Sequence, residues 1–266
     1  MAFIKDKGRV LAFDAKAHEG DRSSRGRLFR ANEVFEHFSN SAVIPPSLVL
    51  TAEGTAVTAA TYGTGLGGWA VITSDDVLAK SHSLNGQGLN WEADRQPAGQ
   101  PLVFECRVKV GTLATREFWF GISDALADTD PIALSLTSTF TTSVPTDGVY
   151  LGYSATPTSG AAFLSGGNSH TGIAIKTDVN TIVVGGTTAT YPRTDAFVTN
   201  TFYTYRIEVS AAGDAAYFID GQFAGAKGAA LAANVPLTIV QYAVPRATAG
   251  SSEAVMSIDY SYIGGG

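Results

Sequence analysis

The side chains that could carry out chemistry are few and widely spaced in this sequence. No histidine among His18, His37, His82 and His170 has another histidine or a cysteine at metal-site spacing. The single cysteine, Cys106, falls on the apolar side of an alternating segment, where we expect a buried and unreactive thiol. No Gly-x-Ser-x-Gly motif of a nucleophilic hydrolase occurs. These residue types therefore predict no catalytic centre.

Two short motifs resemble ligand-binding loops. Residues 63–68 match Gly-x-Gly-x-x-Gly, but residues 69–73 read as a strand, whereas a dinucleotide fingerprint requires a helix there. We interpret this motif as a glycine-rich turn. Asp124, Asp128 and Asp130 could offer oxygens to Ca²⁺, yet their spacing is loose and aspartates also cap turns. We predict no cofactor and no required metal, with a shallow Ca²⁺ loop as the alternative.

Alternating apolar and polar residues predict the strands that would position any site. The clearest are residues 102–110, 203–209 and 215–219, with a turn at Asp220-Gly221 and a last strand near the C-terminus. In that last strand we place Met256, Ile258, Tyr260 and Tyr262 on one face and Ser257, Asp259 and Ser261 on the other. The predicted shared core contains Leu102, Phe104, Cys106, Val108, Tyr205, Ile207, Val209, Ile258 and Tyr260.

Composition agrees with one large all-β domain. The 266 residues are 45% hydrophobic and 16% charged and include 29 glycines, as expected for many strands joined by turns. One cysteine excludes an internal disulfide framework. The net charge of −6 argues against nucleic-acid binding by the body, and no apolar run approaches a membrane span. We also see no secretory signal and expect synthesis in a bacterial-type cytoplasm.

The first 35 residues differ from the rest and predict a basic N-terminal arm. Residues 1–30 hold eight basic and four acidic side chains, a balance of +4 that leaves −10 for the remaining 236 residues. A short helical turn is predicted near residues 30–38, with Asn32 as its cap. We expect the arm to dock on a neighbouring subunit or a capsid shell, or alternatively to cover its own sandwich. Its predicted partner-binding residues are Arg9, Phe13, Arg22, Arg25, Arg27, Phe29 and Arg30.

Residues 202–225, FYTYRIEVSAAGDAAYFIDGQFAG, resemble the strand and hairpin pattern of the concanavalin A-like (laminin-G-like) sandwich. Residues 89–110 and 116–131 are similar to a group of bacteriophage virion proteins with this fold. The resemblance spans roughly residues 36–264 and implies an all-β jelly-roll sandwich of two antiparallel sheets over residues 36–266. Its motifs are structural, and the arm lies outside it.

The resemblance implies a non-enzymatic structural protein of a bacteriophage particle. We expect a decoration or cement protein of the virion that binds the major capsid protein or another virion protein and forms homo-oligomers. Glycosidases of this sandwich class carry paired carboxylates on one strand, near Glu-x-Asp-x-x-Glu, and no such strand occurs here. Glu105, the nearest strand carboxylate, lies beside Arg107 and Lys109 on a polar face that we interpret as solvated.

Aromatic residues keep a second function open. Trp69, Trp91 and Trp119, with ten tyrosines, could form a stacking surface for sugars, although aromatic residues of a sandwich are mostly core. Trp119 lies in a run that is apolar on both faces, so part of this run must be core or interface. The alternative is therefore a lectin-like module, in a tail or head fibre, that binds a host glycan. A glycoside hydrolase is the third hypothesis.

Overall fold

The structure is a computed structural model that describes part of the chain. The described residues are 2–6, 9–13, 33–37, 48–52, 61–62, 69–74, 82–86, 88, 91–96, 99–111, 116–124, 132–134, 140–142, 147–154, 160–165, 173–175, 181–184, 187–190, 198–232, 234–245 and 253–265. Two compact units are present, Met1–Glu33 and Val34–Gly266. In the first unit, β1 (Ala2–Asp6) and β2 (Arg9–Phe13) pair antiparallel with each other.

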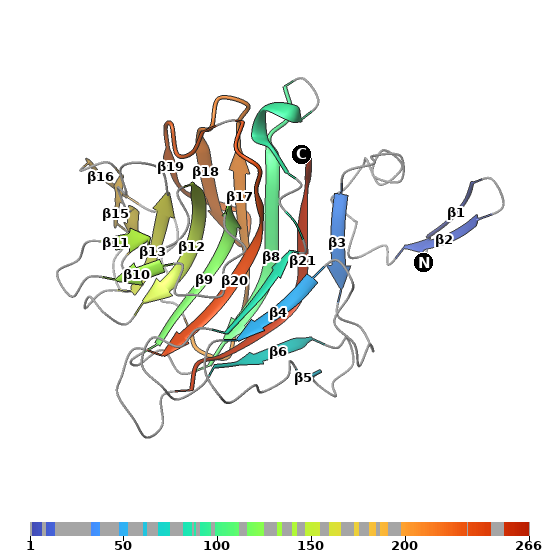
Figure 1. Cartoon of the computed structure of the whole chain (residues 1–266), viewed down its shortest axis with the longest axis horizontal. Coiled ribbons are helices and arrows are strands. Elements are labelled where there is room, and N and C mark those ends of the chain that lie inside the picture. Colours follow the sequence, from blue (N-terminus) through green and yellow to red (C-terminus); the bar gives the residue numbers. More distant parts are fainter. Residues whose placement is uncertain are drawn as a thin grey trace. The chain divides into compact units, whose positions relative to one another are not determined.

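The second unit is built from two large antiparallel sheets (Figure 1). The nine-stranded sheet has the order β16 (Thr187–Thr190), β15 (Thr181–Val184), β14 (Ile173–Ile175), β13 (Gly160–Ser165), β12 (Gly148–Ser154), β9 (Arg116–Ser123), β20 (Thr238–Pro245), β7 (His82–Gly86) and β4 (Leu48–Ala52). The eight-stranded sheet has the order β19 (Gln222–Lys227), β18 (Ala215–Ile219), β17 (Phe202–Val209), β8 (Leu102–Val110), β21 (Val255–Gly265), β6 (Ala70–Thr73) and β5 (Thr61–Tyr62), and β3 (Glu33–His37) also pairs with β21. A separate pair, β10 (Ile132–Leu134) and β11 (Phe140–Thr142), and one 3₁₀ turn, η1 (Ala93–Arg95), complete the described elements.

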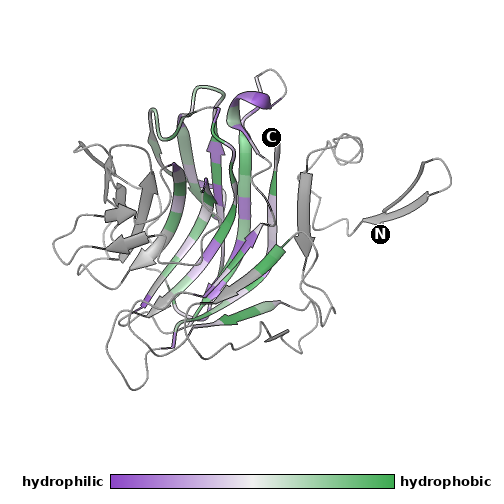
Figure 2. Ribbon diagram, in the orientation of Figure 1, coloured by the Kyte–Doolittle hydropathy of each residue, from purple (hydrophilic) through white to green (hydrophobic). Residues whose placement is uncertain are grey.

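The inner faces of the two large sheets form one hydrophobic core. Along β8 every second side chain from Leu102 to Val110 is buried, and the charged residues between them, Glu105, Arg107 and Lys109, are half-buried. Figure 2 shows hydrophobic and hydrophilic segments along this strand. Phe118, Phe120 and Ile122 of β9 supply the facing layer. The structure confirms the predicted burial of Leu102, Phe104, Cys106, Val108, Tyr205, Ile207, Val209 and Ile258 in this core.

The last strand departs from the predicted alternation because it contains a β-bulge. Ile258 lies opposite Val108 and Tyr260 lies opposite Arg107, so Asp259 is an extra residue in β21. Beyond the bulge the two faces exchange, and Ser261 and Ile263 are buried while Tyr260 is half-buried. The prediction that Tyr260 lies in the core was therefore wrong, since period 2 was extended through a position where the register shifts.

The predicted helical turn at residues 30–38 was also wrong, because residues 33–37 form strand β3. Strand β6 pairs only with the first part of β21, from Val255 to Ile258, whereas β21 continues to Gly265. The backbone N–H and C=O groups of a strand that lacks a neighbour need other hydrogen-bond partners. Strand β3 also pairs with β21, in addition to the strands in the main order of the sheet. Tertiary pairing thus outweighs the local helical tendency of this segment.

The predicted turn at Asp220-Gly221 is confirmed by its backbone. Ile219 pairs with Gln222 across a two-residue loop, and both loop residues have positive φ, 48° at Asp220 and 75° at Gly221. These angles fit a type I′ turn, whose twist matches the flanking strands. The turn also returns to β17, because the Asp220 carboxylate accepts a hydrogen bond of 2.7 Å from the Thr204 main-chain N–H.

A polar contact crosses the core between the two sheets. The Gln241 side-chain amide of β20 donates a hydrogen bond to the Ser261 hydroxyl of β21, and both residues are fully buried. Such a bond satisfies groups that would otherwise be costly in an apolar layer. None of the described residues belongs to a helix long and apolar enough to span a membrane.

Candidate functional site

The outer face of the eight-stranded sheet, the side turned away from the core, carries the described charged side chains of β8 and β17. Glu105, Arg107 and Lys109 occupy the positions of β8 between its buried residues. The strand register places Arg206 opposite Glu105 and Phe202 opposite Lys109. One antiparallel pairing therefore brings cations, carboxylates and an aromatic ring onto the same surface.

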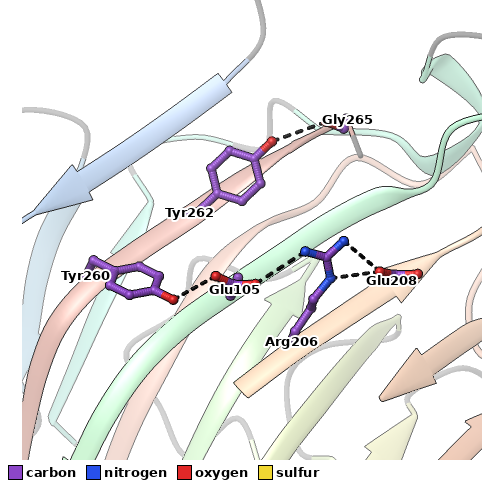
Figure 3. A network of polar contacts seen from close by, with 6 residues as sticks. All are labelled: Glu105, Arg206, Glu208, Tyr260, Tyr262 and Gly265. Atoms are coloured by element: carbon purple, nitrogen blue, oxygen red, sulfur yellow. Dashed lines mark hydrogen bonds and ion pairs between the residues drawn. The ribbon is translucent and has the colours of Figure 1, made fainter. Parts of the chain in front are cut away.

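A hydrogen-bonded network joins residues of β8, β17 and β21 on this face (Figure 3). Arg206 holds Glu208 through two bonds, 2.7 Å from Nε and 2.6 Å from Nη2 to Oε1, and its Nη1 lies 3.3 Å from Glu105 Oε2. The Tyr260 hydroxyl donates to Glu105 Oε1 at 2.7 Å. The Tyr262 hydroxyl donates to the Gly265 carbonyl at 3.2 Å. The arginine thus ties two carboxylates together, and the tyrosine fixes one of them.

The network shifts the pKa values of two of its members. Burial is the largest cause that raises the pKa of the Tyr260 hydroxyl, followed by the charge of Glu105 and the hydrogen bond to it. Burial by itself would lower the pKa of Arg206, but the hydrogen bonds and charges of Glu208 and Glu105 outweigh it, so that pKa is raised. Tyr260 therefore stays neutral and Arg206 stays charged well beyond neutral pH.

A second group on the same face combines aromatic rings with cations. We call Trp69, Phe202, Lys109, Arg107 and Asp259 the aromatic–cation cluster. The Lys109 Nζ lies 4.7 Å from the Trp69 ring centroid and 5.1 Å from that of Phe202. The Arg107 guanidinium lies 4.6 Å from the Phe202 centroid, and the two rings meet edge to face at 5.9 Å. These distances are those of cation–π contacts.

The bulge in β21 completes the aromatic–cation cluster. Its extra residue, Asp259, pairs with Arg107 at 2.5 Å, and the Arg107 side chain remains 42% exposed while Asp259 is 16% exposed. Among the described residues Lys109 makes no ion pair with an acidic side chain. The cluster therefore offers two half-buried rings, one cation paired with a carboxylate, and one cation that has no counter-charge among the described residues.

The outer face of the nine-stranded sheet also carries aromatic residues, but these are buried. Trp119 of β9 lies opposite Tyr242 of β20, and both have no exposed surface although neither belongs to the core cluster. Tyr150 of β12 lies opposite Gly121, where an added Cβ would come within 2.0 Å of the Val149 carbonyl oxygen. The expectation that part of the run around Trp119 is core is confirmed by Phe118 and Phe120.

The structure places few of the other candidate residues in a site. Cys106 is buried, and burial, followed by the Glu105 charge, raises the pKa of its thiol, in agreement with an unreactive cysteine. His82 is buried, with Nδ1 within 2.5 Å of the Thr73 carbonyl oxygen. No cluster of three metal-ligating side chains occurs within the described ranges, and Asp128 and Asp130 lie outside them.

The predicted partner-binding residues of the arm are not brought together by described contacts. Arg9 and Phe13 are the ends of β2, while Arg22, Arg25, Arg27, Phe29 and Arg30 lie outside the described residues. Their role stays a prediction. The sequence-based prediction did not include Phe202 in a site. Its position could have indicated one, because Phe202 shares the outward-facing phase of this strand with the polar residues Thr204 and Arg206.

Comparison with known proteins identifies the fold. No protein-family model matches the chain, and no curated protein matches its sequence. Among solved structures, a family 16 endo-glucanase from Bacteroides ovatus matches 86% of this chain and 99% of its own, with 9% identity and a TM-score of 0.54. The Emp47p carbohydrate recognition domain matches 87% and 94%, with 11% identity and 0.51. A Bacillus licheniformis β-glucanase matches 88% and 98%, with 11% identity and 0.50.

The chain therefore has the all-β, concanavalin A-like jelly-roll fold that the sequence predicted. The comparisons correct the prediction that it is not an enzyme, because many of the matching structures are glucanases, with a transglycosylase beside them. That prediction rested on several missing motifs, namely histidines or cysteines at ligand spacing, Gly-x-Ser-x-Gly and paired carboxylates on one strand, and on a resemblance to virion proteins. Missing motifs do not exclude a differently built site. Identities of 9–12% transfer the fold and not a reaction.

The raised pKa of Tyr260 predicts a specific loss of stability at alkaline pH. The folded state holds this proton beyond the pKa of about 10 of an unfolded tyrosine, so its contribution is complete below pH 10 and falls as pH rises further. We expect Tyr260→Phe to make the decline shallower by up to about 1.4 kcal/mol per pH unit. Urea unfolding between pH 8 and 11 measures this, and equal slopes for both proteins would contradict it.

Proposed function

We propose that this protein binds carbohydrate through the aromatic–cation cluster on its eight-stranded sheet. The observation that carries the proposal is the pair of half-buried rings, Trp69 and Phe202, set among charged side chains on an outer face. Similarity of fold to glucanases and to a carbohydrate recognition domain supports it. The proposal concerns glycan binding; hydrolysis of the bound glycan is a separate question, which the experiment below also measures.

The chemistry of the cluster suits a sugar ring. The apolar C–H face of a sugar packs on an aromatic ring, while its hydroxyl groups need donors and acceptors around that ring. Arg107 and Lys109 supply donors beside Phe202, and Asp259 supplies acceptor oxygens. Trp91 is in the core and Trp119 has no exposed surface, so Trp69 is the tryptophan available to a ligand from solvent.

A second proposed function is that of a structural protein in a bacteriophage particle, as a decoration protein or as part of a tail or fibre. It is supported by the sequence resemblance of residues 89–110 and 116–131 to virion proteins and by the separate basic arm. In this proposal the protein is located in the virion, and the arm binds the major capsid protein, another virion protein or a second copy. Glycan binding by the body is compatible with such a role.

Carbohydrate binding is tested with a glycan array followed by titration of any glycan that binds. We expect Trp69→Ala and Phe202→Ala each to weaken binding at least tenfold, about 1.4 kcal/mol, because the stacking surface is lost. Phe223→Ala is the matched control, since Phe223 is 49% exposed on the edge strand β19 of the same sheet. A reducing-end assay on the same samples measures whether binding leads to hydrolysis. Equal losses in all three variants, or no glycan bound, would contradict the proposal.

The virion role is tested by deletion of residues 1–30. We expect a folded body with a nearly unchanged melting temperature that no longer cosediments with purified particles or self-associates, because the docking segment is gone. Full-length protein under the same conditions is the control. Unchanged occupancy of the truncated protein on particles at raised salt would show that the arm is not the anchor. Misfolding of the truncated chain would instead indicate that the arm covers its own sandwich.

A further inference from the structure

We propose that the aromatic–cation cluster selects an acidic carbohydrate, with Lys109 pairing with a carboxylate or sulfate group on the sugar. This inference rests on the proposed carbohydrate binding and adds the class of ligand. It depends on one juxtaposition: an ammonium group lies within about 5 Å of two half-buried rings and has no described counter-charge.

Among the described basic side chains of β8 and β17, Lys109 is the one without an acidic partner. Arg107 is paired with Asp259, and Arg206 is shared between Glu208 and Glu105. Lys109 has only the two rings as described partners. An aromatic ring attracts a cation through its quadrupole but carries no net charge, so the two rings do not act as a counter-charge for the ammonium group.

The rings also fix where the charge is presented. Lys109 lies opposite Phe202 in the β8–β17 pairing and opposite Ser257 in the pairing of β8 with β21. Its backbone is therefore held on both sides. Its Nζ contacts Trp69 and Phe202 together. A sugar stacked on either ring would therefore carry its substituents within reach of the ammonium group. A neutral sugar would leave that charge without a counter-ion, whereas an acidic sugar supplies one.

General attraction of the protein for anions does not explain such a preference. The chain carries a net charge of −6, which repels an acidic polymer at long range. A preference for acidic sugars must then arise locally, from the cluster itself. Because one partly exposed ion pair is involved, we expect a modest effect of about fivefold in affinity.

The test compares a matched pair of ligands, an oligogalacturonate and its methyl ester, which have the same sugar rings and differ in charge. We expect wild-type protein to bind the free acid about fivefold more tightly than the ester, and Lys109→Met to bind both equally. Methionine keeps an unbranched side chain but removes the charge, and Lys109→Arg should retain the preference. A sulfated oligosaccharide and its unsulfated parent, measured in parallel, determine which acidic group is preferred.

Several results would overturn the inference. Equal binding of acid and ester by wild-type protein would do so, as would a preference that survives in Lys109→Met. Equal binding of polyglutamate and oligogalacturonate would show general polyanion attraction in place of sugar recognition. Binding of neutral glycans that depends on Trp69 but shows no preference for acids would overturn this inference while supporting the proposed function. Absence of any carbohydrate binding would instead contradict the proposed function itself.

Discussion

Burial of one side of strand β8 is the constraint on which the rest of the body depends. Its alternate residues, from Leu102 to Val110, enter the core, and the same alternation directs Glu105, Arg107 and Lys109 outward. A shift of one residue would place three charged side chains in the core, so the register is strongly determined. The register in turn sets the partners that the outer side chains meet on β17 and β21.

The bulge at Asp259 is the one irregularity that the candidate site requires. Without an extra residue, Ile258 and Tyr260 would share a face, and either the core or the polar network would lose a member. With it, the inner face keeps Ile258 and Ile263, while Asp259 pairs with Arg107 and Tyr260 with Glu105. A single inserted position thus serves both packing inside and charge pairing outside.

Local patterns predicted the fold class, but not the bulge in β21, strand β3 or the candidate site. Strand β8 and the Asp220-Gly221 turn could be predicted because strand alternation and turn-forming residues depend only on neighbouring positions in the sequence. The cluster of Trp69, Lys109 and Phe202 could not be predicted, since it joins β17, β8 and the residue before β6, and the order of these strands along the sheet is set by tertiary pairing. The exclusion of an enzyme failed for a related reason: it was argued from the absence of known sequence motifs, whereas one fold can support several chemistries.

A carbohydrate ligand is expected to bind where Trp69 lies, on the outer face of the eight-stranded sheet. The three tryptophans report on this directly in an NMR titration of indole N–H signals with an acidic oligosaccharide, because Trp91 and Trp119 are buried and Trp69 is half-buried. We expect the Trp69 signal to move with ligand concentration while the signals of Trp91 and Trp119 stay in place. A shift of the Trp119 signal with Trp69 unchanged would contradict the claim and place binding on the nine-stranded sheet.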